Sequence, residues 1–235
     1  MIVESMDHLE LKKEVLRDFQ KLRETTEERI AAAYDKERRK FKIEKTRSYS
    51  KVYPVKTASK NNWLIFINKA PAQEIYKGFD SMNVCYVVYF YTSTGLSVIN
   101  IASGHLELYY GHFFKRYNER MKLGLTNTLD AVKKYFANGG FGVYSVVKKD
   151  GKDYSIGVSG EGLLLGEVIH NRQWVINKTF ISRDIMRSDQ DATEKELMDT
   201  LHNDILKALV TRQDDAYKKS SNIIAALTSV RGNIS

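Results

Sequence analysis

A histidine and two arginines recur every four residues in the segment Gly111–Arg120, whose sequence is Gly-His-Phe-Phe-Lys-Arg-Tyr-Asn-Glu-Arg. At about 100° per residue, His112, Arg116 and Arg120 lie on one face of a helix. Glu119 adds a carboxylate to the same face. An imidazole can transfer protons near neutral pH, and the planar guanidinium of arginine can hold a phosphate with two hydrogen bonds. This combination indicates chemistry on a phosphodiester, although an ordinary solvent-exposed helix face can have the same composition.

Length and composition are those of a globular protein with a sizeable core. The chain has 235 residues, of which 43% are hydrophobic and 28% are charged, values typical of one large domain or of a domain with attached helices. The single cysteine, Cys85, lies in an apolar run and is expected to be a buried structural thiol. One cysteine excludes an internal disulfide framework and a Cys-rich zinc site. Because no segment has the pattern of a signal peptide or a membrane-spanning helix, we expect a soluble cytoplasmic protein without a membrane partner.

The net charge of +8 is concentrated in one segment of the chain. Residues 36–60 contain ten Lys or Arg and two Glu, so this segment accounts for the whole charge excess. Tyr49 and Tyr53 are interleaved with these cations, and such a mixture can bind single-stranded nucleic acid through charge and stacking. The segment is predicted either to bind RNA or another polyanion, or to be a solvated linker. The residues expected to bind nucleic acid here are Arg38, Arg39, Lys40, Lys42, Lys45 and Arg47.

Hydrophobic periodicity predicts an α+β fold with long amphipathic helices at both termini. Apolar residues at three- and four-residue spacing predict a helix over residues 9–41, which either packs on its own domain or forms a homodimer. A capping box, Thr193-x-x-Glu196, predicts the start of the last helix. We expect three regions: a helix and basic segment in 1–62, an α+β core in 63–190, and a C-terminal helix packed on the core in 191–235.

The core is predicted to be an antiparallel sheet, formed by a hairpin and a four-stranded meander, with helices packed against it. Residues 106–110 are expected to form a first helical turn before the helix that contains His112, and Asn127 to begin a second helix. Short turns such as Asp150-Gly151 between successive strands favour antiparallel pairing. Apolar and β-branched runs predict strands at residues 63–67, 84–91, 96–101, 141–147, 154–158, 163–169 and 174–181.

The order of these elements resembles small ribonuclease and toxin domains of the barnase, colicin and RelE-like type. Residues 96–182 combine a strand, a His-x3-Arg-x3-Arg helix, a second helix and four strands, and are most similar to the branch with a His-Ala-x-x-Arg-x-x-x-Arg helix. Phe113 stands where that branch has a small residue. The resemblance implies RNA cleavage, with His112 as base or acid and Arg116 and Arg120 holding the phosphate. It also implies that the last strand completes the site through Thr179, Ser182 or Lys178.

The implied reaction needs one base and one acid but no metal or cofactor. A base removes the ribose 2′-proton, the freed oxygen attacks the adjacent phosphorus, and an acid protonates the departing 5′-oxygen. Glu119 is either that base or an ion-pair partner of Arg116. His105 and His112 do not have the His-Glu-x-x-His spacing of a zinc site. The alternative is a non-catalytic α+β module that binds nucleic acid or an acidic protein; a toxin-like nuclease would instead have an antitoxin-like partner.

Overall fold

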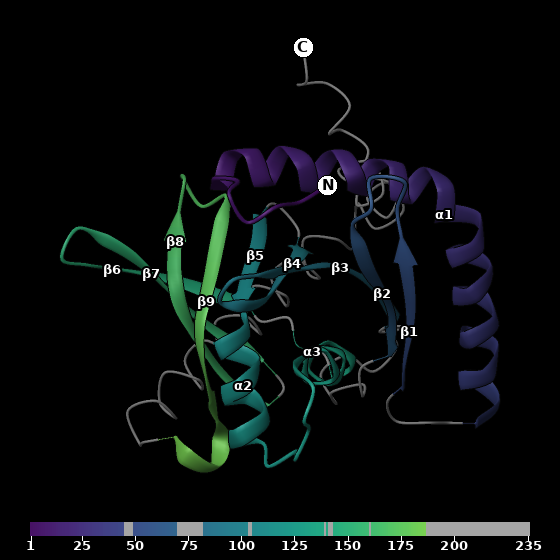
Figure 1. The fold of residues 1–235 in the computed structure, drawn as a ribbon. Helices are drawn as coiled ribbons and strands as arrows, with labels where there is room; N and C mark the ends of the chain where they lie inside the picture. Colours follow the sequence, from purple (N-terminus) through teal and green to yellow (C-terminus); the bar gives the residue numbers. More distant parts are fainter. Residues whose placement is uncertain are drawn as a thin grey trace, which may run out of the picture. The chain divides into compact units, whose positions relative to one another are not determined.

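The computed structural model describes residues 1–44, 49–69, 82–102, 105–138, 140, 143–159 and 161–186. These residues belong to one compact unit, Met1–Met186. They form nine strands in a single mixed sheet and three α-helices, which confirms the α+β class (Figure 1). The predicted C-terminal helix at 191–235 lies outside the described residues.

None of the helices in the described part of the chain is both long enough and apolar enough to cross a membrane.

The strands follow the order β1-β2-β3-β4-β5-β9-β8-β7-β6 across the sheet. Neighbouring strands pair antiparallel except β5 and β9, which are parallel and join the two halves of the sheet. Between β5 and β9 the chain passes through two helices and the strands β6 to β8, so this parallel pair closes a long crossover. The strands are β1 (Tyr49–Lys56), β2 (Asn62–Lys69), β3 (Met82–Thr92), β4 (Gly95–Ala102), β5 (His105–Tyr110), β6 (Val143–Lys149), β7 (Lys152–Ser159), β8 (Gly162–Ile169) and β9 (Trp174–Ser182).

Strand β5 corrects the expectation that residues 106–110 form a helical turn. Its first residues alternate between the two sides of the sheet: Leu106 and Leu108 are buried on one side, and Tyr109 is buried on the other. This is the two-residue period of a strand, and both faces are apolar because helices cover both sides of the sheet.

Strand β1 is not predicted by the sequence, because its basic sequence lacks a continuous apolar run.

Helix α1 (His8–Glu44) packs along one face of the sheet, where the sequence predicted a helix over residues 9–41 (Figure 1). Leu11, Val15 and Leu22 from its apolar stripe are buried against this face. The stripe that was considered for a homodimer is thus used within the chain, and homodimerisation stays a prediction.

A buried carboxylate fastens α1 to the turn between β1 and β2. Oδ2 of the fully buried Asp18 accepts hydrogen bonds from the Thr57 hydroxyl at 2.9 Å, and from the Asn61 amide and the Trp63 indole N–H at 2.8 Å each. Burial raises the pKa of the Asp18 carboxyl, but its hydrogen bonds, of which that from Trp63 has the largest effect, together outweigh burial, so the pKa lies below its usual value.

Helices α2 (Gly111–Arg120) and α3 (Thr128–Ala137) cover the opposite face of the sheet. Phe113, Phe114 and Tyr117 of α2 are buried there among other aromatic rings, several of which meet edge to face. The predicted start of α3 is confirmed, since the Asn127 side chain accepts a hydrogen bond from a backbone N–H in the first turn. The aromatic core therefore fixes which side of α2 faces solvent.

Candidate functional site

Helix α2 takes the place of a strand beside the second half of β9. Strand β5 ends at Tyr110 and α2 begins at the next residue. The pairing of β9 with β5 stops at Asn177, whereas β9 itself continues to Ser182. Figure 1 shows α2 lying along this continuing part of β9. The polar side of α2 is thereby brought against the last residues of the strand.

Three side chains of α2 contact two consecutive residues of β9. Nε2 of His112 lies 3.0 Å from the backbone oxygen of Lys178. Nη1 of Arg116 donates to Oγ1 of Thr179 at 2.9 Å, and Nη1 of Arg120 donates to the same oxygen at 3.5 Å. The structure thus brings together four residues that the sequence singled out: His112, Arg116, Arg120 and Thr179, called here the His112 cluster.

The contact of His112 with β9 determines which ring nitrogen carries a proton. A carbonyl oxygen can only accept a hydrogen bond, so Nε2 must carry a proton and Nδ1 is left for another partner. The ring of His112 also lies nearly parallel to that of Tyr110, with ring centroids 5.9 Å apart. These two contacts hold the imidazole in one orientation.

Lys178 is the extra residue of a β-bulge. Thr179 pairs with Leu165 and Asn177 pairs with Gly166, so Lys178 has no opposite residue in β8. A bulge changes the direction of the side chains around it, and bulges occur next to active sites more often than elsewhere. Here the bulge separates Asn177, which is buried, from Thr179, which reaches the arginines. Nζ of Lys178 donates to the Glu167 carboxylate at 2.6 Å.

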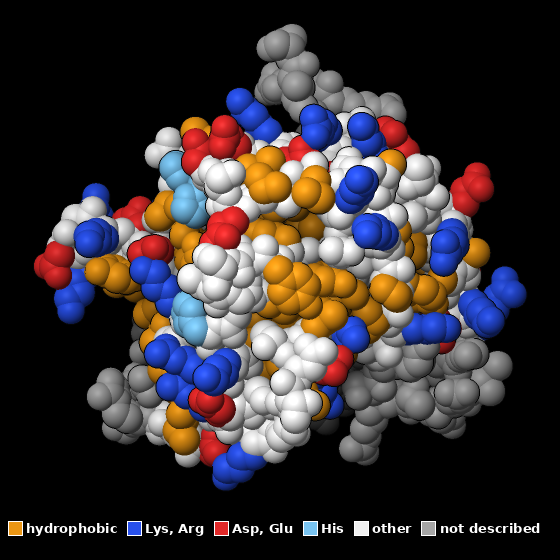
Figure 2. Space-filling view, viewed as in Figure 1, with side chains coloured by type: hydrophobic (Ala, Val, Ile, Leu, Met, Phe, Trp, Pro, Cys, Tyr) orange, Lys and Arg blue, Asp and Glu red, His pale blue; other side chains and the backbone are white. Residues whose placement is uncertain are grey.

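The His112 cluster is open to solvent and predominantly positive. The side chains of His112 and Arg116 are exposed, and those of Arg120 and Thr179 are half-buried. The neighbouring Lys115 is also exposed. Figure 2 shows Lys and Arg side chains gathered beside a histidine on the surface over α2 and β9. An anion could reach these groups directly from solvent.

A second acidic group holds α2 and α3 in place. The Tyr117 hydroxyl and the Asn138 amide each donate to the Glu161 carboxylate at 2.7 Å. Burial and the bond to Glu161 raise the pKa of Tyr117, so its hydroxyl stays protonated. These bonds connect α2, the end of α3 and the turn between β7 and β8, and so support the helix that carries the site.

Two residues predicted for catalysis lie outside these contacts. Ser182 is buried, and its hydroxyl donates to the Asp184 carboxylate instead of approaching the arginines. Glu119 is exposed on α2 and forms no ion pair within the described part of the chain, so the expected pair with Arg116 is not formed. The Glu119 carboxylate is therefore free to meet a ligand.

The basic segment lies in the other half of the unit. Arg38 and Arg39 are exposed near the end of α1, beside β1 and far from α2 in Figure 1. Lys51 of the same segment has a structural partner, since its Nζ donates to Glu37 at 3.3 Å and lies 5.2 Å from the Tyr53 ring centroid. Lys40 and Lys42 belong to the last turns of α1, and Lys45 and Arg47 lie outside the described residues.

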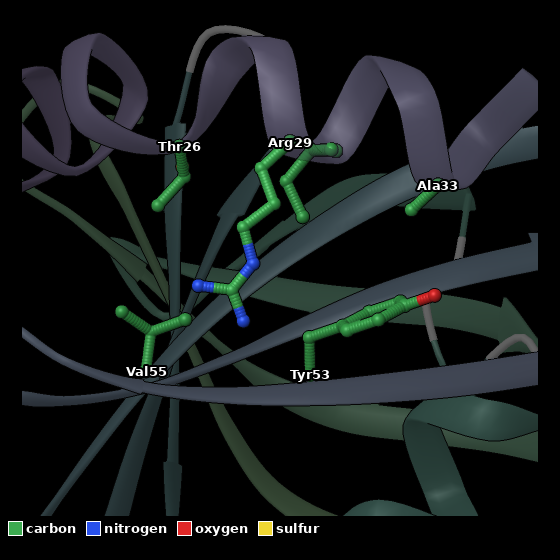
Figure 3. Close-up of a pocket in the computed structure, with 6 residues that line it drawn as sticks. Thr26, Arg29, Ala33, Tyr53 and Val55 are labelled. Carbon is green, nitrogen blue, oxygen red and sulfur yellow. The ribbon is translucent and has the colours of Figure 1, made fainter.

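A pocket between α1 and β1 includes residues of this segment in its lining. It is lined mostly by apolar side chains, and Figure 3 shows the guanidinium of Arg29 extending between α1 and Val55. None of its lining residues is a histidine, a cysteine or a carboxylate. The lining residues are Thr26, Arg29, Ile30, Ala33, Tyr53 and Val55.

A buried polar network behind β9 was not predicted from the sequence. Oε2 of Glu107 accepts hydrogen bonds from the Asn100 amide at 2.8 Å and the Tyr109 hydroxyl at 2.7 Å. The Tyr144 hydroxyl lies 3.3 Å from that of Tyr109 and accepts from the Asn177 amide. Burial raises the pKa of both tyrosines well above the usual value. The network links β4, β5, β6 and β9 immediately before Lys178; the only sequence signal was Glu107 between two leucines.

The two candidate metal-ligating histidines are separated by β5, since His105 begins this strand and His112 lies in the first turn of α2. Nε2 of His105 is 3.4 Å from Oε1 of Glu107, whereas His112 contacts β9. Within the described ranges, no three His, Cys, Asp or Glu residues come together as a group that could hold a metal ion.

Cys85 is buried, its thiol donates a hydrogen bond to Oδ1 of Asn100, and burial raises the pKa of the thiol, as expected for a structural cysteine.

Comparisons of the chain with protein-family models, with curated proteins and with solved structures found no match. The resemblance to ribonuclease-toxin domains therefore rests on the pattern of residues 96–182 alone. The contacts between α2 and β9 are the main guide to function.

Proposed function

We propose that the His112 cluster is a site for metal-independent cleavage of RNA phosphodiesters, in a toxin-like protein of the cytoplasm with an antitoxin-like or other protein partner. The observation that carries the proposal is the convergence of Arg116 and Arg120 on the Thr179 hydroxyl beside a fixed, exposed imidazole. Two permanent cations and a proton-transfer group on one rigid element are a large part of what this reaction requires, and a second proton-transfer group completes it.

The arginines supply the phosphate-binding function. Each guanidinium has five N–H donors, and Thr179 occupies one donor of each. The remaining donors of Arg116 and Arg120 can hold the non-bridging oxygens of a phosphate. The pentacovalent phosphorus carries more negative charge than the ground state, so fixed guanidinium groups stabilise the transition state more than the bound substrate.

In the proposed site, a phosphate held by Arg116 would have a proton-transfer group on each side along the helix. With a rise of about 1.5 Å per residue, His112 lies about 6 Å before Arg116 along the helix axis and Glu119 about 4.5 Å after it. An in-line displacement needs its base and its acid on opposite sides of the phosphorus. In our mechanism His112 begins doubly protonated. The Glu119 carboxylate takes the 2′-proton, the 2′-oxygen attacks phosphorus, and the bond from phosphorus to the 5′-oxygen breaks. The departing 5′-oxygen takes the proton from Nδ1 of His112, which leaves a neutral ring with its proton on Nε2.

The requirement for a 2′-oxygen makes RNA the substrate and excludes DNA. The products are a 2′,3′-cyclic phosphate and a free 5′-hydroxyl, in which atoms and charges balance without water or a metal. Lys178 is held by Glu167 in the unliganded protein and becomes a further phosphate ligand when that ion pair opens.

The test is incubation of the purified full chain with single-stranded RNA of mixed sequence in EDTA. We expect a 2′,3′-cyclic phosphate end that disappears in His112→Ala. The matched control is His170→Asn, because His170 is an exposed histidine away from α2 with a left-handed backbone (φ 52°) that asparagine tolerates. Loss of cleavage in the control, or activity retained in His112→Ala, would contradict the assignment.

A second candidate is RNA binding without cleavage, and one contact favours it. Nε2 of His112 is hydrogen-bonded to the backbone oxygen of Lys178, just beyond the last residue of β9 that pairs with β5. This contact gives the ring a structural role. In that case the wild-type protein binds RNA and cuts none. His112→Ala would then lower stability and would leave the RNA intact, as the wild type does.

A further inference from the structure

The face of the sheet opposite α2 and α3 has exposed apolar side chains on the strands β6 and β7. Ile176, which packs on the α1 side, pairs with Glu167, Glu167 with Tyr154, and Tyr154 with Val147. Residues directly opposite one another on neighbouring strands share a face. Tyr154 and Val147 are exposed by 38% and 45%, so α1 does not cover this part of the face.

Cations flank this row of side chains. Lys149 and Lys152 are exposed and pair with each other beside the turn, two residues from Val147 and Tyr154, so they share the same face. On the other side lies Lys178 of β9, held by Glu167. The β6–β7 hairpin projects from the body in Figure 1, and Figure 2 shows hydrophobic side chains between lysines on it.

The row continues into the His112 cluster. Tyr110 packs on the α1 side and lies at the end of β5, one residue beyond the pair Tyr109–Asn177, which places it level with Lys178. Its ring is stacked on that of His112. Tyr110 and Tyr154 are three strand spacings apart, or about 14 Å, with the Lys178–Glu167 pair between them. The face therefore offers two aromatic rings and several cations in line with the arginines.

We propose that this face, from Tyr110 to Tyr154, binds single-stranded RNA next to the phosphate held by Arg116 and Arg120, with a base stacked on the Tyr154 ring. This inference rests on the proposed function and names the form of the substrate. Stacking on an aromatic side chain requires an unpaired base, while the lysines attract the backbone. A duplex keeps its bases stacked on one another and cannot use the Tyr154 ring.

Glu167 has a defined part in this binding. Its carboxylate lies between Tyr154 and Ile176 and forms an ion pair with Lys178. It therefore repels phosphate and also neutralises a cation that could bind it. Glu167→Gln removes the negative charge and releases Lys178. RNA should then bind more tightly, although a residue of the binding face has been changed.

The experiment measures affinity by fluorescence anisotropy with a labelled 2′-O-methyl RNA, whose blocked 2′-oxygen cannot attack, so that binding is separated from cleavage. Tyr154→Ala should weaken binding at least about fivefold, the low end for loss of one base–aromatic stack. Tyr154→Phe should bind like the wild type because the ring is kept. The matched control is Tyr91→Ala, since Tyr91 is 66% exposed on β3 in the other half of the sheet. Duplex RNA should bind more weakly than the single strand and show no effect of Tyr154→Ala.

Equal binding of the single strand by wild type and Tyr154→Ala overturns the inference, and this result stands apart from cleavage, which His112→Ala tests on unmodified RNA. Binding that depends on Tyr154 in a protein that cuts no RNA supports the RNA-binding face and contradicts the nuclease. A third outcome also overturns the inference: poly-glutamate that binds as tightly as RNA and is indifferent to the Tyr154 ring would show a surface for acidic proteins.

Discussion

Replacing Thr179 with valine tests whether one hydroxyl positions both arginines. Valine keeps the branched shape of threonine and removes the hydroxyl oxygen that Arg116 and Arg120 both contact. Because Thr179 is half-buried and Arg116 is exposed, the released N–H groups can bind water. We therefore expect the free energy of unfolding to fall by less than about 1 kcal/mol.

The expected effect on catalysis is larger than the effect on stability. A hydrogen bond to a charged group contributes about 1.5–3 kcal/mol when it is protected from water. The bond from Arg116 at 2.9 Å is exposed and the bond from Arg120 at 3.5 Å is long, so about 1–2 kcal/mol of transition-state stabilisation is a reasonable sum. This corresponds to a loss of about five- to thirtyfold in kcat/KM.

The assay is cleavage of a fluorophore-quencher RNA, measured under single-turnover and steady-state conditions. The loss should appear mainly in kcat, since the charge that the arginines stabilise grows in the transition state. Thr179→Ser, which restores the hydroxyl, should recover most of the activity. The reasoning is refuted if Thr179→Val unfolds the protein at a much lower urea concentration, or if its kcat equals that of the wild type while Arg116→Ala is inactive.

Three further predictions concern other residues. Arg116→Lys should lose at least about tenfold in kcat/KM because an ammonium cannot make a two-pronged phosphate contact; wild-type activity would show that charge alone suffices. Asp18→Ala should lower the free energy of unfolding by about 3 kcal/mol in urea titrations at pH 7, since two buried donors and one half-buried donor lose their acceptor. Because the folded pKa of Asp18 is depressed, its contribution is fully present above the unfolded pKa of about 4, and the gap between wild type and variant should narrow as the pH falls below it; a constant gap would show that the charge is irrelevant. RNA affinity should depend less steeply on salt when four cations of the basic segment are changed to glutamine: Arg38, Arg39, Lys40 and Lys42. An unchanged salt dependence would show that the segment is a linker and does not bind RNA.

The local features of the site could be predicted from the sequence. His112, Arg116 and Arg120 share a face because the helical period depends only on the chain around them. The apolar side of α2 was equally clear from Phe113 and Phe114, and it decides which side is left for solvent. For such features the sequence and the structure agree because no distant residue is involved.

Features that depend on distant residues could not be predicted in this way. β5 is only six residues long and runs directly into α2 at Gly111, so its short alternation does not distinguish a strand from the first turn of the helix. The buried Glu107 carboxylate requires the Asn100 amide of β4 as a donor besides the nearby Tyr109 hydroxyl, and no local pattern indicates that donor. Ser182 was expected to reach the site, but the bulge at Lys178 alters the alternation along β9, and the Ser182 side chain is buried.

The parallel pairing of β5 with β9 also has a consequence for the order of folding. Every other pairing in the sheet joins two strands that follow one another along the chain, so β1 to β5 and β6 to β9 can each form without the other. Joining them requires Leu106 to find Trp174, a loop closure whose entropy must be lost before any pairing is gained. During synthesis β1 to β5 are complete before β9 has been made, so one edge of β5 is unpaired. An unpaired edge can bind a strand of another chain. The rate at which the second half is made and docks therefore sets how long each new molecule is exposed to aggregation.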